Sequence, residues 1–203
     1  GQSEENLRKA IRIAEAAAPC VLWIDEIEKG FSGIGDSNDS MTRMFGYFLS
    51  WLQDKTSGVY VIATANNASN LPPELKRKGR FDEIFCVNLP NDDERKKIFE
   101  VHIAKKKKRS ADWEKIKNHS SFKTLIEKTK GFNGADIEAV VNEAVEGCFL
   151  KSLDKKDGAA QPLEIADLIK IAGDTISITK SCKPQIEAME KIFKESSFKD
   201  ASK

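Results

Sequence analysis

Hydrophobic residues near the start of the chain follow first a helical spacing and then a continuous run. Over residues 3–17 they recur every three to four positions, and acidic residues stand at the beginning of the segment, as is typical of a helix. Pro19 ends this helix, because proline has no backbone N–H for a further helical turn. Residues 20–24 (CVLWI) are all apolar over the length of a strand, which predicts a central parallel strand covered on both faces.

The alternation of helix and strand patterns continues as far as residue 87. It predicts in turn a glycine-rich loop, a helix with one apolar side, a strand, a short helix with proline at its start, and a third short strand. These segments cover residues 30–38, 40–54, 59–64, 72–75 and 83–87. Helices and strands in alternation are typical of a parallel α/β sheet.

Beyond Asp92 the pattern changes to one helix after another, with no convincing strand. The predicted helices cover residues 92–108, 120–129, 134–151, 162–172 and 184–196. We expect a flexible loop over residues 154–162 and a frayed end after Phe198. The expected fold class is therefore α/β and then all-α, with an α/β domain over residues 1–91 and a helical domain over residues 92–203.

The composition narrows the classes of function. The 203 residues are 40% hydrophobic and 32% charged, with a net charge of +1, which fits a folded domain and argues against a dedicated nucleic-acid binder. The sequence has no run of 18 apolar residues and no signal peptide at its start, so we expect no membrane span and a cytoplasmic location. Four widely separated cysteines favour buried thiols in a reducing compartment, and two histidines without metal-ligand spacing argue against a zinc site.

Two acidic residues follow the first predicted strand. Ligands of parallel α/β sheets bind beyond the carboxyl ends of the strands, and Asp25 and Glu26 stand at such an end. The pair suits phosphoryl transfer, in which one carboxylate holds Mg²⁺ through its water shell and the other polarises an attacking water. By itself, however, an Asp-Glu pair favours the simpler interpretation that both acids end the strand in solvent.

Two further segments carry candidate chemistry. Asn66 follows the second strand and would lie beside Asp25 if the two strands are neighbours, where its amide would hold a water or a phosphate oxygen. Arg77 and Arg80 follow the short helix, and an arginine on a loop can contact the transferring phosphate of a neighbouring subunit. Taken alone, the asparagine fits an ordinary turn and the arginines fit a basic surface loop.

Four segments together resemble the AAA ATPases of the AAA+ superfamily. They correspond to the Walker B strand, the sensor-1 strand, the arginine-finger segment and the start of the lid helix, and their order and spacing agree as well. The segments are residues 18–28 (APCVLWIDEIE), 61–67 (VIATANN), 71–82 (LPPELKRKGRFD) and 131–137 (GFNGADI). The resemblance covers almost the whole chain. The amino-acid sequences of two segments are most similar to those of a bacterial and plastid subgroup whose role is poorly defined. It implies part of a P-loop NTPase sheet followed by an AAA helical lid.

The resemblance assigns roles near the phosphates. Asp25 would support Mg²⁺ through water, Glu26 would activate the attacking water, and Asn66 would be sensor 1. Arg77 and Arg80 match the two arginines that reach into the neighbouring subunit's site.

The resemblance also assigns residues near the nucleoside of ATP. His102 matches a histidine that lies beside the ribose and adenine in many members, although a partly buried helix histidine explains the residue equally well. Gly134 and Ala135 match lid residues near the nucleotide.

One motif of the family is missing. A Walker A loop, G-x-x-x-x-G-K-[S/T], does not occur in the sequence, although its amides and lysine normally hold the phosphates. The first residues resemble the stretch after the aromatic pore loop, so we interpret the chain as a fragment that begins there. We expect it to lack tight ATP binding and turnover by itself, and to expose apolar surface where the missing strand and helix would pack.

The whole protein is accordingly expected to hydrolyse ATP with Mg²⁺ in a homo-oligomeric ring, with a hexamer as the expected form, and to remodel protein substrates. Two alternatives stay open at this point. One is a scaffold or assembly module without enzymatic activity. The other is an ATPase linked to nucleic acid through the basic run 105–109, which otherwise forms the solvated end of a helix.

Overall fold

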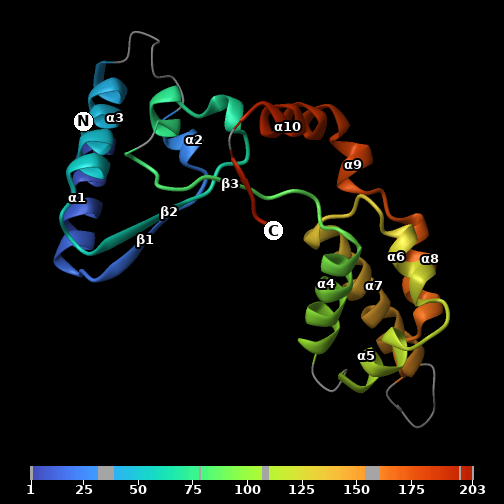
Figure 1. The fold of residues 1–203 in the computed structure, drawn as a ribbon. Helices are drawn as coiled ribbons and strands as arrows, with labels where there is room; N and C mark the ends of the chain where they lie inside the picture. The colour runs from blue at the N-terminus through green and yellow to red at the C-terminus, as the bar shows by residue number, and fades with distance from the viewer. Residues whose placement is uncertain are drawn as a thin grey trace. The chain divides into compact units, whose positions relative to one another are not determined.

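The computed structural model describes residues 2–31, 39–77, 79–106, 110–153, 161–196 and 198–202. The chain forms two compact units (Figure 1). The first consists of Gly1–Val87 together with Ala188–Lys203, and the second of Asn88–Glu187. The predicted helical domain, 92–203, differs from this division at its C-terminal end, because the last residues group with the first unit.

The first unit contains the predicted parallel sheet. Its elements are α1 (Gln2–Ala16), β1 (Cys20–Ile24), α2 (Ile27–Gly30), α3 (Asp39–Asp54), β2 (Val59–Ala63), the 3-10 helices η1 (Ala68–Asn70) and η2 (Pro73–Lys76), β3 (Phe85–Cys86) and β4 (Lys199–Asp200). β1 and β2 pair in parallel, with Cys20 opposite Val59 and Ile24 opposite Ala63. Both strands therefore end at the same edge, as the sequence pattern requires for a common site.

One face of this sheet carries the core of the first unit. α1 and α3 pack against each other, and α1 also contacts β1. Phe48 is completely buried at the centre, and the ring of Phe31 lies 5.3 Å from it and 4.9 Å from that of Phe45. Aromatic rings at these separations pack favourably, so α3 is anchored by its predicted apolar side.

The described part of the chain leaves the other face of the sheet exposed. Val21, Trp23 and Tyr60 are 60%, 62% and 67% exposed, and the register places Val21 directly opposite Tyr60. The prediction that the first strand is covered on both faces is therefore wrong for the described part of the chain, because its helices pack on the Leu22 side alone. The expected exposure of apolar surface is confirmed.

The second unit is helical around one core. Its helices are α4 (Asp92–Ala104), α5 (Ser110–Lys117), α6 (Phe122–Lys128), α7 (Gly134–Leu153), α8 (Ile165–Asp174) and α9 (Ile178–Ser181), and α10 (Lys183–Glu195) begins there. α7 packs against both α4 and α8. The fully buried side chains of the core of this unit include Phe99, Leu125, Ile137 and Leu168.

The end of the chain differs from its prediction. Instead of fraying, residues 199–200 form β4 and pair in parallel with β3, although no strand was predicted beyond Asp92. The Lys199 amide donates to the Ile84 carbonyl at 2.9 Å, and the Lys199 ammonium lies 2.6 Å from the Glu83 carboxylate. A pairing across more than a hundred residues leaves no periodic signal in either segment, which explains why it was not predicted.

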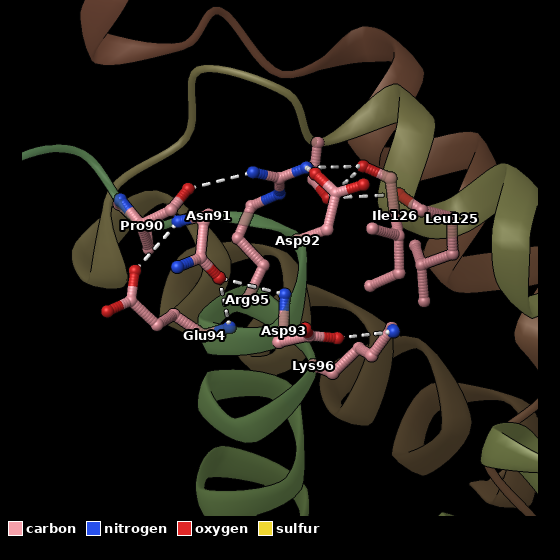
Figure 2. A network of polar contacts seen from close by, with 10 residues as sticks. Pro90, Asn91, Asp92, Asp93, Glu94, Arg95, Lys96, Leu125 and Ile126 are labelled. Carbon is pink, nitrogen blue, oxygen red and sulfur yellow. Dashed lines mark hydrogen bonds and ion pairs between the residues drawn. The ribbon is translucent and has the colours of Figure 1, made fainter. Parts of the chain in front are cut away.

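A buried arginine fixes the start of the second unit (Figure 2). Only 3% of Arg95 is exposed. Its guanidinium donates to the carbonyls of Pro90 and Ile126 at 2.8 and 3.1 Å, and to the Asp92 carboxylate at 2.7 Å. Arg95 thereby ties the segment before α4 to the C-terminal end of α6, where a cation is also favoured by the helix dipole.

Replacing Arg95 with alanine is expected to lower the free energy of unfolding by about 3 kcal/mol, because the Pro90 carbonyl loses a charged donor and a buried stem is removed. Lys96→Ala is the matched control. Lys96 forms an equally short but exposed ion pair with Asp93, at 2.7 Å, so its loss should leave the free energy of unfolding nearly unchanged. Chemical denaturation followed by circular dichroism measures both, and equal losses would contradict the role given to Arg95.

Candidate functional site

The turn after β1 has an unusual backbone. Asp25 and Glu26 separate β1 from α2, and Glu26 adopts a left-handed conformation with φ 50° and ψ 51°. A side chain other than glycine in this region costs about 1 kcal/mol, so the surroundings must hold it there. The turn directs two carboxylates to the end of the sheet, where Asp25 is exposed and Glu26 half-buried.

Thr64, the residue after β2, supplies that support. Its backbone donates to the Ile24 carbonyl and accepts from the Ile27 amide, both at 2.9 Å. Its hydroxyl donates to Oδ1 of Asp25 at 2.5 Å and accepts from the Glu26 amide at 3.0 Å. One residue thus binds four consecutive residues of the turn. Sequence reasoning missed Thr64, because its signal in the sequence was merely a polar residue at the end of an apolar strand.

Asn66 lies beside the same turn, as predicted for neighbouring strands. Its side-chain amide donates to Oε1 of Glu26 at 2.6 Å, so its partner is Glu26 rather than Asp25. Its backbone amide donates to Oε1 of Glu28 at 3.0 Å. Glu28 is only 5% exposed, and among the described residues its other oxygen has no hydrogen-bond partner. Glu28, which the sequence analysis did not single out, therefore fixes the position of the Asn66 backbone.

The second oxygen of Glu26 faces a lysine. Lys29, one turn further along α2, lies 2.6 Å from Oε2 of Glu26. This hydrogen bond and the negative charge of Glu26 raise the pKa of Lys29. Since Asn66 donates to one oxygen and Lys29 to the other, the Glu26 carboxylate is held in a defined orientation.

The donor set fits a metal that keeps most of its water. Among the described residues there is no group of three or more His, Cys, Asp or Glu side chains that could form a protein cage for an ion. Asp25 presents an exposed carboxylate of which Oδ1 accepts from Thr64. Mg²⁺ characteristically binds through one or two carboxylates, waters and substrate phosphates, so the residues present fit Mg²⁺ brought with a nucleotide.

The two predicted arginines differ in their surroundings. Arg77 ends η2 and is exposed, and no partner of its guanidinium occurs in the described part of the chain. Arg80 is half-buried, and its guanidinium donates to the Glu74 carbonyl at 2.7 Å. Lys78, between them in the sequence, lies outside the described residues. Arg77 is therefore the more accessible of the two.

The three residues predicted near the nucleoside lie in the second unit. His102 belongs to α4, and its Nδ1 is 3.6 Å from Oε1 of Glu138 in α7. Gly134 and Ala135 form the first turn of α7, one turn before Glu138. His102 thus lies at the level of Glu138, one turn of α7 beyond Gly134 and Ala135. His102 is a partly buried helix histidine, and its contact with a nucleotide stays a prediction.

The start of α7 also has a structural explanation. Asn133 and Asp136 each accept a hydrogen bond from the other's backbone amide, at 2.8 and 3.1 Å, which caps the helix. The Asp136 carboxylate further accepts from the Ile178 amide at 3.0 Å. Gly131 has φ 83°, and a Cβ there would lie 2.8 Å from the Thr179 hydroxyl, so glycine is required. Most of the segment 131–137 therefore serves to dock α7 and α9.

Comparison with known proteins decides the family. Residues 1–89 match the family model "ATPase family associated with various cellular activities (AAA)", and residues 120–159 match the model "AAA+ lid domain". The two matches together cover more than half of the chain and occur in the order that the fold requires. The chain belongs to the AAA family. The predicted fold class, part of a P-loop α/β domain followed by a helical lid, is confirmed.

Relatives of this AAA chain include proteins of different kinds. It is 43% identical over 168 residues to the "Uncharacterized AAA domain-containing protein ycf46" of Pyropia yezoensis, covering 82% of this chain and 32% of that protein. It is 32% identical over 151 residues to the "ATP-dependent zinc metalloprotease FtsH" of Mycoplasma mobile, covering 71% and 20%. The chain thus spans a third or less of the length of these relatives.

Solved structures agree on the fold. The AAA domain of FIGL-1 superimposes with a TM-score of 0.70 at 20% identity, over 96% of this chain and 63% of that one. The same domain in complex with ADP gives a TM-score of 0.68 at 21% identity, over 96% and 64%. Within the described residues, none of the helices of this AAA chain is long and apolar enough to cross a membrane.

Proposed function

We propose that this AAA chain contributes the hydrolytic half of an ATPase site that uses Mg²⁺. The observation that supports the proposal best is the arrangement of Asp25, Glu26 and Asn66 at the end of two parallel strands. A carboxylate that is oriented by an amide, beside a second exposed carboxylate, suits the activation of water next to a phosphate.

The residues divide the work between them. Glu26 accepts a proton from the attacking water, and the Asn66 amide keeps the Glu26 carboxylate aligned. Asp25 holds the water shell of Mg²⁺, and the ion, when bound, neutralises charge on the phosphates. In the second unit, His102, Gly134 and Ala135 would contact the nucleoside of ATP.

The proposal extends to assembly. Arg77 is exposed and Arg80 is attached to the same short segment, so both suit contact with a nucleotide held by a neighbouring subunit. A contact in trans needs a neighbouring chain. We infer that identical chains form a closed ring, a hexamer, and hydrolysis in such a ring would exert force on a protein substrate. We infer this activity for the whole protein, because these 203 residues contain no Walker A loop. We also propose a cytoplasmic location for it.

Nucleotide binding tests this division of the site. Calorimetry with ATP should show tight binding to a longer form of the protein that includes a Walker A loop. The 203-residue chain should bind far more weakly, because the amides and lysine that hold the phosphates are absent from it. Comparable tight binding by both would place the phosphate site within these residues and contradict the proposal.

A further inference from the structure

We propose that Thr64 is a positioning residue of the site, whose hydroxyl sets the mutual arrangement of Asp25 and Glu26. The inference rests on the proposed function. Thr64, the residue after β2, would hold the turn between β1 and α2 in the conformation in which Glu26 is left-handed. The carboxylates of Asp25 and Glu26 cannot do this themselves.

The backbone hydrogen bonds of Thr64 do not depend on its side chain, whereas its hydroxyl forms two contacts that are specific to this residue. The two backbone hydrogen bonds, to the Ile24 carbonyl and from the Ile27 amide, continue the pairing of the strands and are open to every residue except proline. The hydroxyl alone reaches the Asp25 carboxylate and the Glu26 amide. The hydroxyl therefore links Asp25, proposed to hold the water shell of Mg²⁺, to Glu26, proposed to activate the attacking water.

A hydroxyl is suited to this place because it donates and accepts at once. Its hydrogen goes to Oδ1 of Asp25, which leaves the other carboxylate oxygen for the water shell of an ion. Its lone pair receives the Glu26 amide, a group that would otherwise be unpaired in the left-handed turn. The β-branched side chain at Thr64 also restricts the hydroxyl to few orientations.

Loss of the hydroxyl should therefore act on both carboxylates. The hydrogen bond of the Glu26 amide offsets the free-energy cost of its left-handed backbone. Without an acceptor for this amide, Glu26 should relax toward a right-handed or extended conformation. That relaxation moves the Glu26 carboxylate away from the Asn66 amide, which orients it at 2.6 Å. Asp25 loses the Thr64 hydroxyl as a donor and turns more freely into solvent.

Hydrogen exchange in the 203-residue chain tests the contact itself. Thr64→Val keeps the shape of the side chain but removes the hydroxyl, and should speed exchange of the Glu26 amide about tenfold. Thr64→Ser should retain protection. Thr124→Val, which makes the same change at an exposed site on α6, should leave the Glu26 amide unchanged. Equal protection in wild type and Thr64→Val would overturn the proposal.

Turnover in the longer form tests the consequence. Thr64→Val should lower kcat about ten- to a hundredfold and raise the Mg²⁺ concentration needed for half-maximal rate, with the KM for ATP little changed. Thr64→Ser should recover most of the rate. Normal turnover in Thr64→Val, or equal losses in both variants, would overturn the positioning role. A wild-type protein without any ATP hydrolysis would instead overturn the proposed function, while the exchange experiment would still decide whether the hydroxyl holds the turn.

Discussion

Glu26→Gln in the longer form of the protein is expected to lower ATP turnover by about 10³-fold and to leave ATP binding intact. Glutamine keeps the size of the side chain, and its carbonyl oxygen can still accept from the Asn66 amide. It cannot accept a proton from water, and its amide nitrogen cannot accept from Lys29, so the base is lost together with the ion pair to Lys29. Phosphate release gives the rate, and the nucleotide content of the purified protein gives the binding.

Glu5→Gln is a matched control for this change. Glu5 is an exposed residue of α1, so the same loss of charge there should alter neither rate nor binding. If Glu26→Gln hydrolyses ATP at the wild-type rate, Glu26 is not the base. If the variant fails to bind ATP, Glu26 has a different role from the one proposed.

Arg77→Ala is expected to lower turnover by a similar factor, about 10³, if Arg77 contacts the transferring phosphate of a neighbouring subunit. The structure makes this variant informative. The guanidinium of Arg77 has no partner in the described part of its own chain, so its removal should leave the thermal stability unchanged. Arg80→Ala should also lose turnover, but it removes the hydrogen bond to the Glu74 carbonyl as well.

Mixed assemblies separate a contact in trans from a local effect. An Arg77→Ala subunit retains Glu26, and a Glu26→Gln subunit retains Arg77, so mixing the two should restore part of the activity that each lacks alone. Arg12→Ala, an exposed arginine of α1, serves as the control and should keep full activity. Mixtures that stay inactive would contradict the role of Arg77 as a finger.

Much of the first unit could be predicted from the sequence. The bounds of β1 agree with its apolar run, and β2 ends one residue before its predicted end, because apolar runs of five residues leave a continuous hydrophobic signal. The short helices α2 and α9 were missed, since four residues are too few for a helical period to emerge. The eight-residue α5 was missed as well, with few apolar positions to set a period.

The candidate site could be predicted only as far as its residues follow a local pattern in the sequence. Asp25, Glu26 and Asn66 were found because they follow strands and match a known motif. Thr64 and Glu28 were missed because their importance depends on the register of β1 against β2 and on the turn of α2, which bring partners 38 residues apart into contact. Composition and periodicity contain no information on that register.

Some predictions fall on residues that the structure leaves out. Most of the predicted loops 30–38 and 154–162 lies outside the described residues, as do residues 107–109 of the basic run. The first part of that run is accounted for locally, because the Lys106 ammonium donates to the Asn142 side chain at 2.6 Å. This contact gives Lys106 a role within the second unit and adds nothing in favour of nucleic-acid binding.

The rate of phosphate release by the longer form tests most directly whether the residues at the turn held by Thr64 hydrolyse ATP. With ATP and Mg²⁺ we expect sustained release, which stops when EDTA removes the ion. A folded protein that binds ATP and Mg²⁺, assembles into a ring and still releases no phosphate would show that this turn is not a hydrolytic site.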